Sequence, residues 1–360
     1  MSERSALWIS TRTTTRGGIA TYVRAVQQTP LWTEWNIQHI ATHRDGSAAV
    51  KVGCFLAGSA SFLRRIMLRP PDVVHIHASS GGSFIRKAIL LWLSRARRVP
   101  VVLHIHSGAI EDFYGSAPRP ARAAIRATLR NARVVVALGQ HWGARLSRIT
   151  PDARIVVVPN AVHIGQVVSQ PEPDEALRVV FLGRIGEHKG TFELLNAWAR
   201  LASQHEAASG VTFPARLTIA GDGQVEEARR RTAALNIEDS VEVSGWLSAE
   251  EAAQLLDRSH VLVLPSRGEG QPMAVLEAMA RGLCVIASDV GGIPEMIAGG
   301  CGVTVQPDDA EGLSAALKRV IYDRDLRVRC GVAAHARATE NFSIDAVWRQ
   351  LDELYRGVVR

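Results

Sequence analysis

Short apolar runs alternate with longer amphipathic stretches along the whole chain. In the first half these runs predict strands at Ala6–Ser10, Asn36–Ala41, Asp72–His77, Val101–His106, Arg133–Leu138 and Arg154–Val158. In the second half they predict strands at Arg178–Leu182, Arg216–Ala220, Val241–Ser244, Val261–Leu264 and Val285–Ala287. Several runs are continuously apolar rather than alternating, which is typical of parallel strands that helices cover on both faces.

Helical patterns fill the spaces between these strands, so the pattern predicts two doubly wound α/β units. A chain of 360 residues is also long enough for two domains. The polar stretch 166–175 holds two prolines and predicts the linker. We therefore expect domains at residues 1–165 and 166–343, and a last amphipathic helix at Ile344–Val358.

The composition fits an ordinary globular protein with a full core. Apolar residues make up 47% of the chain, and the longest apolar run, Ala88–Leu93, is far shorter than the ~18 to 20 residues that cross a bilayer. The N-terminus has no signal-peptide pattern, and the 4 cysteines form no C-x-x-C pair. We expect a reduced, cytoplasmic protein.

Charge is distributed unevenly between the two halves. Residues 1–165 hold 22 Lys/Arg and 7 Asp/Glu, a net charge of +15, whereas residues 166–360 hold 20 and 28, a net charge of −8. The segments 62–69 and 86–98 mix basic and bulky apolar residues, as do helices that lie on anionic lipid; a core-facing helix with a basic edge has the same composition. Because no nucleic-acid signature accompanies this charge, we favour the inner face of the plasma membrane as the partner.

The segment Arg267–Glu277 carries the most chemical information. Its two carboxylates, Glu269 and Glu277, have seven residues between them, and we expect a helix to begin at Pro272, because proline suits a first helical position. Free amides at such a helix start bind phosphate. A carboxylate beside them is suited to hydroxyl groups instead. The combination points to a nucleotide-sugar, although the two carboxylates alone also resemble the acid/base pair of a glycoside hydrolase.

Glycine-rich loops follow other predicted strands. Gly17 and Gly18 precede a helix, which lets backbone approach a phosphate or sugar; an ordinary tight turn explains a lone Gly-Gly equally well. In the second half, Arg184 and Lys189 follow a strand end, where two cations can clamp a diphosphate. The segment Asp289–Glu295 has a similar Gly-Gly turn. None has the spacing of a dinucleotide fingerprint or a P-loop, which argues against NAD, flavin and ATP.

Two His-x-His pairs, His75/His77 and His104/His106, end two predicted strands. Residues two apart share a face of a strand, so a zinc site is one interpretation. No carboxylate or cysteine supplements the histidines, and local hydrogen bonding is the simpler explanation. The better functional interpretation takes His106 alone, in the loop after its strand, as a residue that contacts the reacting sugar.

Taken together, these motifs resemble glycosyltransferase family four, whose members are retaining enzymes of the GT-B fold. The resemblance covers nearly the whole chain and follows the family's order. Its most specific part is the E-x7-E segment that runs into Ala278-Met-Ala-Arg-Gly282. The other matching parts are Gly17-Gly18, Gly183-Arg184 with Lys189-Gly190, and Val290-Gly-Gly-Ile-Pro-Glu295.

The resemblance implies two Rossmann-like domains facing across a deep cleft, the first for the acceptor and the second for the donor, with the helix 344–358 packing back on the first. It implies a catalytic set of His106, which contacts the sugar, Glu269, which holds its hydroxyls, and Arg184 and Lys189, which bind the diphosphate. The implied donor site also includes Gly17, Gly18, Trp246 near the base, Gly270, Gln271, Pro272, Met273, Ala274 and the ribose-binding Glu277. No metal or cofactor is implied.

The implied reaction does not use Glu269 as a nucleophile. The acceptor hydroxyl attacks on the face that the diphosphate leaves, and a diphosphate oxygen accepts the proton. Two positions depart from the family: Cys284 stands where proline is frequent, and Gln271 stands where an aromatic or aliphatic residue is common, which bears on sugar selectivity. A polyprenyl-diphosphate-linked glycan of surface polysaccharide or glycolipid synthesis is the expected acceptor.

Other functions remain open from the sequence. One alternative is a nucleotide-sugar epimerase on the same fold, and another is a soluble glycosyltransferase that acts on a small metabolite. A phosphorylase requires a pyridoxal-phosphate lysine site, which the sequence does not offer. A non-catalytic nucleotide-sugar sensor is disfavoured by the intact set of Glu269, Arg184 and Lys189.

Overall fold

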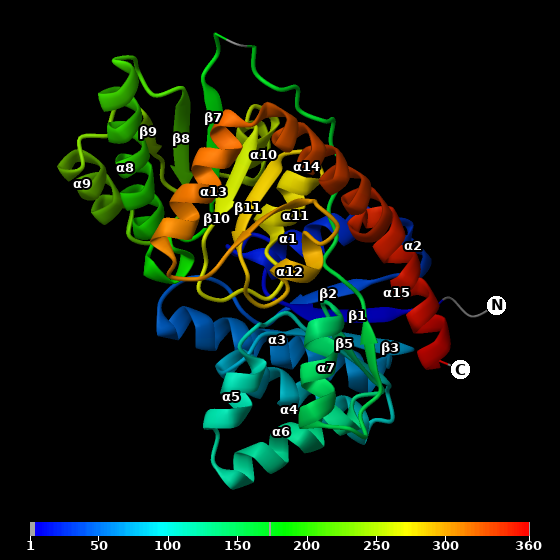
Figure 1. The fold of residues 1–360 in the computed structure, drawn as a ribbon. Helices are drawn as coiled ribbons and strands as arrows, with labels where there is room; N and C mark the ends of the chain where they lie inside the picture. Colours follow the sequence, from blue (N-terminus) through cyan, green and yellow to red (C-terminus); the bar gives the residue numbers. More distant parts are fainter. Residues whose placement is uncertain (1–3, 173, 360) are drawn as a thin grey trace. The chain divides into compact units, whose positions relative to one another are not determined.

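The computed structural model describes residues 4–172 and 174–359. The chain divides into two compact units, one formed by Met1–Ala161 with Ile344–Arg360 and the other by Val162–Ser343. Each unit holds a six-stranded parallel sheet with helices on both faces (Figure 1). The chain therefore has the two α/β units that its pattern of apolar runs predicts.

The sheet of the first unit has the order β2-β1-β3-β4-β5-β6. Its strands are β1 (Ala6–Ser10), β2 (Gln38–Ala41), β3 (Val73–Ala78), β4 (Val101–Ile105), β5 (Val134–Ala137) and β6 (Ile155–Val157). Its helices are α1 (Gly18–Gln27), α2 (Pro30–Glu34), α3 (Ala48–Leu68), α4 (Gly82–Ala96), α5 (Ile110–Ser116), α6 (Arg119–Asn131), α7 (Gln140–Ile149) and α15 (Ile344–Val359).

Two apolar layers hold this first sheet. One lies between the sheet and α3, α4, α6 and α7, and includes Phe62, Leu90 and Leu129. The other lies between the opposite face and α1, α2 and α15. The last helix of the chain thus belongs to the first unit, where the hydroxyl of Tyr355 on α15 accepts a hydrogen bond from Trp8 Nε1 of β1 at 2.8 Å.

The sheet of the second unit has the order β12-β11-β10-β7-β8-β9. Its strands are β7 (Leu177–Leu182), β8 (Ala215–Ala220), β9 (Val241–Val243), β10 (Val261–Leu264), β11 (Cys284–Ser288) and β12 (Gly302–Val305). Its helices are α8 (Thr191–Ser209), α9 (Val225–Ala234), α10 (Ala249–Asp257), α11 (Met273–Met279), α12 (Ile293–Met296), α13 (Ala310–Tyr322) and α14 (Arg324–Arg337), with short 3-10 and π segments at Glu187–Lys189 and Ala338–Phe342.

Local chemistry explains where several of these helices begin and end. α10 starts with a capping box, in which Ser248 and Glu251 exchange hydrogen bonds between side chain and backbone. α8 is bounded by Gly190 and Gly210, both in the left-handed region, with φ of 68° and 69°. A single apolar core fills the second unit and includes the continuously buried strand β10, as expected for a central parallel strand.

Both sheets reverse their strand order once. In the first unit the reversal lies between β1 and β3, and in the second it lies between β7 and β10. Such a point leaves a crevice at the carboxyl ends of the two strands, because their connections run to opposite sides, and open α/β sheets bind ligands there. The loops after β7 and β10 carry the residues that the sequence singles out in the second unit.

The eleven predicted strands all occur, with ends that shift by one or two residues. The twelfth, β12, is missing from the prediction. The predicted helix start at Pro272 is wrong by one residue, because Pro272 is the N-cap in an extended conformation and α11 begins at Met273. The stretch 166–172 contains neither helix nor strand, and the division between the two compact units falls between Ala161 and Val162.

Candidate functional site

The loops after β7 and β10 are joined by an ion pair. Lys189 Nζ donates to Glu269 Oε1 at 2.5 Å, and Ser266 Oγ donates to the same oxygen at 2.7 Å. The Glu269 side chain is 7% exposed, so water screens this pair only weakly. Because both bonds use Oε1, the second carboxylate oxygen of Glu269 can accept from a hydroxyl group of a ligand.

Close backbone packing holds these loops at the reversal point. A Cβ at Gly190 would lie 2.0 Å from Pro265 O, so only glycine allows the start of α8 to approach the β10 loop so closely. The β7 and β8 loops are joined in the same way, since Gly221 has φ of 154° and a Cβ there would lie 1.7 Å from Gly183 O. The glycines of this region therefore serve loop packing as well as any approach to a ligand.

Arg267 holds the outer side of the β10 loop. Its guanidinium pairs with Asp308 at 2.6 Å and with Glu193 at 2.7 Å, and its backbone N–H donates to His188 O at 2.9 Å. The hydrogen bond that Arg267 donates to the Asp308 carboxylate is the main cause of the raised pKa of Arg267. Sequence reasoning missed this role, because the partners of Arg267 lie far from it along the chain.

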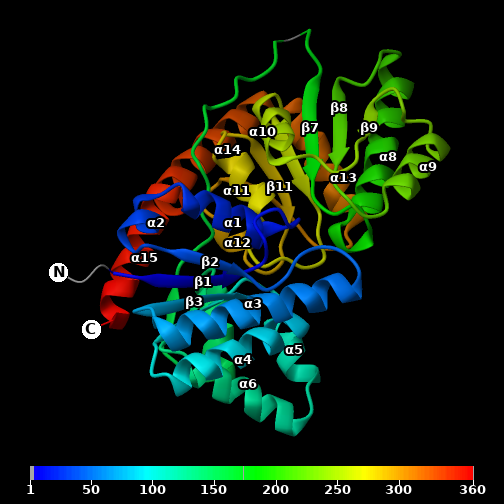
Figure 2. The same cartoon turned by 180° about the vertical axis from the view of Figure 1, so that it is seen from behind.

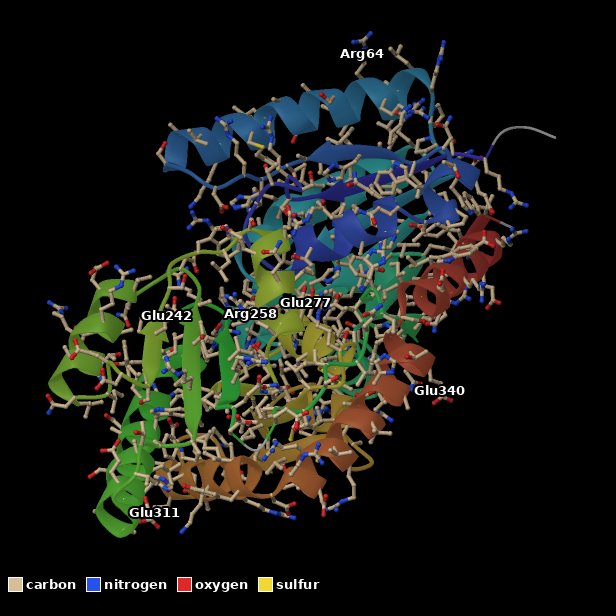
Figure 3. The ribbon with its side chains drawn as sticks, turned by 90° about the horizontal axis from the view of Figure 1, so that it is seen from above. Arg64, Glu242, Arg258, Glu277, Glu311 and Glu340 are labelled. Atoms are coloured by element: carbon tan, nitrogen blue, oxygen red, sulfur yellow. The ribbon has the colours of Figure 1, made fainter. Side chains whose placement is uncertain are left out.

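The β10 loop leads into α11. Gln271 is buried, and Pro272, Met273 and Ala274 are half-buried at the helix start. Glu277 is half-buried inside α11 (Figure 3). Gly270 O accepts a hydrogen bond from Gly292 N at 3.1 Å, which attaches the Gly-Gly turn of the 289–295 segment to the β10 loop.

Two other predicted donor residues lie on exposed parts of the second unit. Arg184 is exposed in the loop after β7, and Trp246, after β9, is 49% exposed. β9 is the edge strand of the sheet, two strands from β7. A direct contact thus brings Lys189 and Glu269 together, and Arg184 and Trp246 follow strands of the same sheet at its carboxyl edge.

Gly17, Gly18 and His106 belong to the first unit. Gly17 is the N-cap of α1 with φ of 115°, and a Cβ there would meet no atom within 4 Å. Gly18 is the first residue of the helix. The turn follows β1, one of the two strands at which the sheet reverses, so its backbone is open at the edge where ligands bind in such sheets.

His106 lies just after β4 and bonds to other side chains. His106 Nε2 and His77 Nδ1 share a hydrogen bond of 2.9 Å. Burial lowers the pKa of His106 to about 3, against a smaller opposing effect of a hydrogen bond with Asn160. The imidazole of His106 is therefore neutral at physiological pH, and it can orient a substrate but carries no positive charge.

The other three histidines form a buried group beside His106. The ligand atoms of His75, His77 and His104 lie within 4.8 Å of one another. Within residues 4–172 and 174–359, no carboxylate or cysteine joins the group, and His75 bonds through one ring nitrogen to Tyr355 and through the other to His104. These bonds favour a hydrogen-bonded network of histidines over a zinc site.

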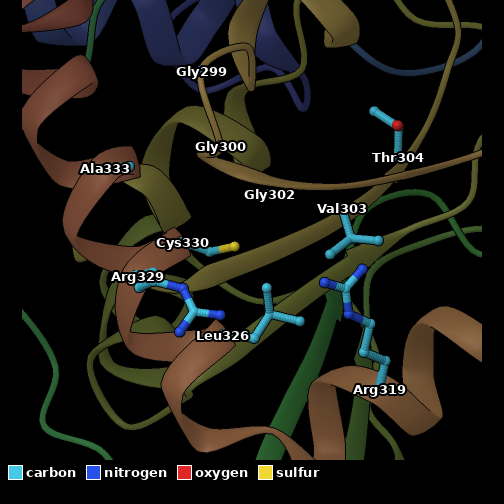
Figure 4. A pocket seen from close by; sticks show the side chains of 10 residues that line it. All are labelled: Gly299, Gly300, Gly302, Val303, Thr304, Arg319, Leu326, Arg329, Cys330 and Ala333. Carbon is cyan, nitrogen blue, oxygen red and sulfur yellow. The ribbon is translucent and has the colours of Figure 1, made fainter.

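A separate hollow of about 680 Å³ lies in the second unit beside β12, α13 and α14 (Figure 4). Arg319 reaches it from α13 and Arg329 from α14, and Cys330 of α14 also lines it. It contains none of the residues that the sequence predicts for the site. The reversal point remains the candidate site, because the predicted residues Lys189 and Glu269 form their ion pair there.

Two family models match adjacent parts of the chain. The glycosyl transferase 4-like domain matches residues 17–161, and the glycosyl transferases group 1 model matches residues 166–337. Together they span most of both units. The chain is a glycosyltransferase of the family-four type. It is therefore an enzyme, as the motifs predict.

Curated relatives of this glycosyltransferase act on different substrates. The glycogen synthase of Mycobacterium tuberculosis is 27% identical over 308 residues, which is 81% of this chain and 70% of the relative. A phosphatidyl-myo-inositol mannosyltransferase of Mycolicibacterium smegmatis is 26% identical over 295 residues, 80% of this chain and 71% of the relative. The relatives agree on glycosyl transfer but not on donor or acceptor.

Solved structures show the same fold. A sucrose-phosphate synthase from Thermosynechococcus elongatus matches with a TM-score of 0.80 at 20% identity, covering 98% of this chain and 99% of the other. The Anabaena protein HepE, solved in complex with UDP-glucose, matches with a TM-score of 0.72 at 16% identity over 98% and 99% of the two chains. The predicted GT-B fold is confirmed.

Proposed function

We propose that this enzyme transfers a hexose from a UDP- or GDP-sugar to an acceptor hydroxyl with retention of anomeric configuration. The observation that carries the proposal is the Lys189–Glu269 pair at the β7/β10 reversal point. A cation and a carboxylate fixed side by side match a donor that presents a diphosphate next to sugar hydroxyls.

The proposed donor contacts combine this ion pair with the residue roles that the family resemblance implies. Lys189 and Arg184 bind the diphosphate, and the second oxygen of Glu269 accepts from a hydroxyl of the sugar. Glu277 holds the ribose, Trp246 lies near the base, and the start of α11 with Gly17 and Gly18 contacts phosphate and sugar. The UDP-glucose complex of HepE, which shares this fold, supports a nucleotide-sugar as donor. The proposal includes no metal or cofactor.

In the proposed reaction the protein stabilises the charge of the leaving group and forms no covalent bond to the sugar. The acceptor oxygen forms a bond to the anomeric carbon, the bond from that carbon to the diphosphate oxygen breaks, and the hydroxyl proton passes to the departing diphosphate. Lys189 and Arg184 offset the charge that develops on the leaving group. Glu269 and the neutral His106 orient the sugar.

A lipid-linked glycan is the proposed acceptor, which places the enzyme on the inner face of the plasma membrane. The net charge of +15 in residues 1–165 supports attraction to anionic lipid. The phosphatidyl-myo-inositol mannosyltransferase among its relatives also favours an acceptor anchored in lipid. Surface polysaccharide or glycolipid synthesis is the proposed process.

A thermal-shift screen with UDP-, GDP- and ADP-sugars tests donor binding, because a ligand that binds only the folded state raises the apparent stability. We expect at least one UDP- or GDP-sugar to raise Tm; no shift with any nucleotide-sugar contradicts the proposal. Proton NMR of the product then tests retention, since an inverted anomeric centre excludes the proposed reaction. Interconversion of the sugar without acceptor identifies an epimerase instead.

A further inference from the structure

Three neighbouring helices of the first unit present an unusual outer surface. α4 packs between α3 and α6 on one side of the sheet (Figure 2). We call the outer surface of these helices the α3–α4–α6 face. Each of the three helices contains basic residues, and none contains Asp or Glu. The positive charge of these helices is therefore not neutralised by acidic residues of the same helices.

The α3–α4–α6 face also exposes bulky apolar side chains. Among the described residues, eight of the fifteen exposed large apolar side chains lie on α3 and α4: Val52, Leu56, Leu63, Met67, Leu68, Ile85, Ile89 and Trp92. Exposed apolar residues that are scattered singly need no explanation, but a concentration on two adjacent helices marks an interaction site.

The spacing of these side chains gives each helix an outward apolar stripe. On α3, Val52, Leu56, Leu63 and Met67 recur at helical spacing, while Phe62 and Ile66 pack into the core. An ordinary surface helix has one apolar stripe, which faces the core. The second stripe of α3 faces outward and is free to contact another apolar environment. On α4, Ile85, Ile89 and Trp92 continue the surface, at 57%, 50% and 42% exposed.

Basic side chains flank these stripes. Arg64 projects away from α3 (Figure 3), and Arg95 is exposed in the last turn of α4. α6 carries Arg119, Arg122, Arg126 and Arg130 at helical spacing, of which Arg122 bonds to backbone carbonyls of Gly115 and Ala117. Apolar side chains bordered by cations match the boundary between the acyl chains and the headgroups of an anionic bilayer.

We infer that the α3–α4–α6 face binds the surface of an anionic membrane, with Leu56, Leu63, Ile89 and their neighbours entering the headgroup region. Trp92 suits this place, because tryptophan is enriched at membrane interfaces, and its Nε1 donates to Thr128 Oγ1 of α6 at 3.2 Å. No helix in the described part of the chain is both long and apolar enough to span a bilayer.

This inference extends the proposed function, because it names the surface that brings the enzyme to a lipid-linked acceptor. Its test requires neither donor nor acceptor. Purified full-length protein is sedimented with vesicles of phosphatidylcholine alone, or with about a third of the lipid replaced by phosphatidylglycerol, at low salt. We expect binding to the anionic vesicles, little binding to the neutral ones, and a steep fall as salt rises.

Paired variants separate the two contributions. Leu56→Ser/Ile89→Ser removes exposed apolar side chains, and Arg64→Glu/Arg126→Glu reverses exposed charges; each is expected to lower the vesicle partition coefficient at least tenfold with an unchanged circular dichroism spectrum. The matched control is Val211→Ser/Val332→Ser, whose side chains are 58% and 62% exposed in the second unit, and it should bind like the unmodified chain.

Three results would overturn the inference. One is no binding to anionic vesicles, or binding that neither face variant changes. A second is loss of binding in the charge variant alone, which would mean that the apolar side chains do not enter the membrane. The third is self-association that Leu56→Ser/Ile89→Ser abolishes, which makes the face an interface between two copies. Donor hydrolysis should persist in both face variants, so failure of the proposed function and failure of this inference are distinguishable.

Discussion

At the scale of single residues, one carboxylate oxygen connects the proposed donor site. Glu269 Oε1 accepts from both Lys189 and Ser266, so the side chain has a fixed orientation before any ligand arrives. A preorganised group stabilises a transition state without the cost of reorganisation. The role that we propose for Glu269 rests on this orientation together with its negative charge.

Glu269→Gln keeps the shape of the side chain and removes the charge. We expect kcat to fall by roughly 10²-fold, the order seen when one oriented polar group is removed from an active site. The Kd for the nucleoside diphosphate should change little, because the proposed partner of Glu269 is the sugar rather than the diphosphate. Isothermal titration and steady-state turnover measure the two quantities, with Glu311→Gln, an exposed change on α13, as the control. An equal loss in both would remove the proposed role.

At the scale of elements, the two glycines that bound α8 are a matched pair. Gly190 and Gly210 have nearly the same φ, 68° and 69°, but a Cβ at Gly190 would lie 2.0 Å from Pro265 O, whereas one at Gly210 would meet nothing within 4 Å. The first glycine sets how closely the loops after β7 and β10 approach each other. The second only ends a helix.

Gly210→Ala should therefore cost only the strain of a left-handed residue, about 1 kcal/mol. Gly190→Ala should cost more, and it should also lower kcat, because the new methyl group displaces the β10 loop that carries Glu269. Urea unfolding and turnover of both variants test this difference. If the two variants lose the same stability and keep full activity, close packing at Gly190 does not position the site.

Sequence patterns predict the elements of this chain far better than its side-chain partners. Continuous apolar runs locate central strands such as β10 (Val261–Leu264) because burial on both faces leaves little choice of residue. β12 (Gly302–Val305) escapes prediction because it is a short edge strand that begins with glycine and is only partly buried. Pro272 is compatible with both the N-cap and the first turn, so the sequence leaves the helix start uncertain by one residue.

At the site, too, residues can be predicted from the sequence but their side-chain partners cannot. The charges and glycines of the candidate site can be recognised at strand ends, and both Lys189 and Glu269 are predicted as site residues. Their direct ion pair is not predicted, because it depends on the order of strands in the sheet, which places the loops of β7 and β10 next to each other across 80 residues of sequence. The partners of Arg267 cannot be predicted from the sequence for the same reason.

At the scale of the whole molecule, the two units differ in charge and in what they bury. The second unit holds the paired charges of the proposed donor site, whereas the first holds a group of neutral histidines beneath His106. Burial lowers the pKa of His75, His77 and His104 well below the ordinary value, and that of His106 to about 3. This difference predicts how the protein responds to acid.

Stability should fall as the pH falls below about 6.5. The unfolded chain binds protons on these histidines near pH 6.5, but the folded chain does not until much lower pH, so the unfolded state binds more protons in between. Each such histidine contributes about 1.4 kcal/mol of lost stability per pH unit within that window. No effect is expected above pH 7.

Urea midpoints between pH 7.5 and pH 5 measure this slope through tryptophan fluorescence. His104→Asn should reduce the slope by about one proton, whatever it does to the stability at pH 7.5. The matched control is His163→Asn, because His163 is exposed and its removal should leave the slope unchanged. A slope that is the same in all three proteins would mean that the buried histidines do not control acid unfolding.

We propose that the β7/β10 reversal point binds a nucleotide-sugar and stabilises its departing diphosphate. The most direct measurement is the rate at which the enzyme releases nucleoside diphosphate from the donor that the thermal-shift screen identifies. The rate is compared between the unmodified enzyme, Lys189→Ala and the surface control Lys318→Ala. Circular dichroism checks that each protein is folded. We expect a rate lowered roughly 10²- to 10³-fold in Lys189→Ala and an unchanged rate in Lys318→Ala. A folded Lys189→Ala enzyme with near-normal release would contradict it.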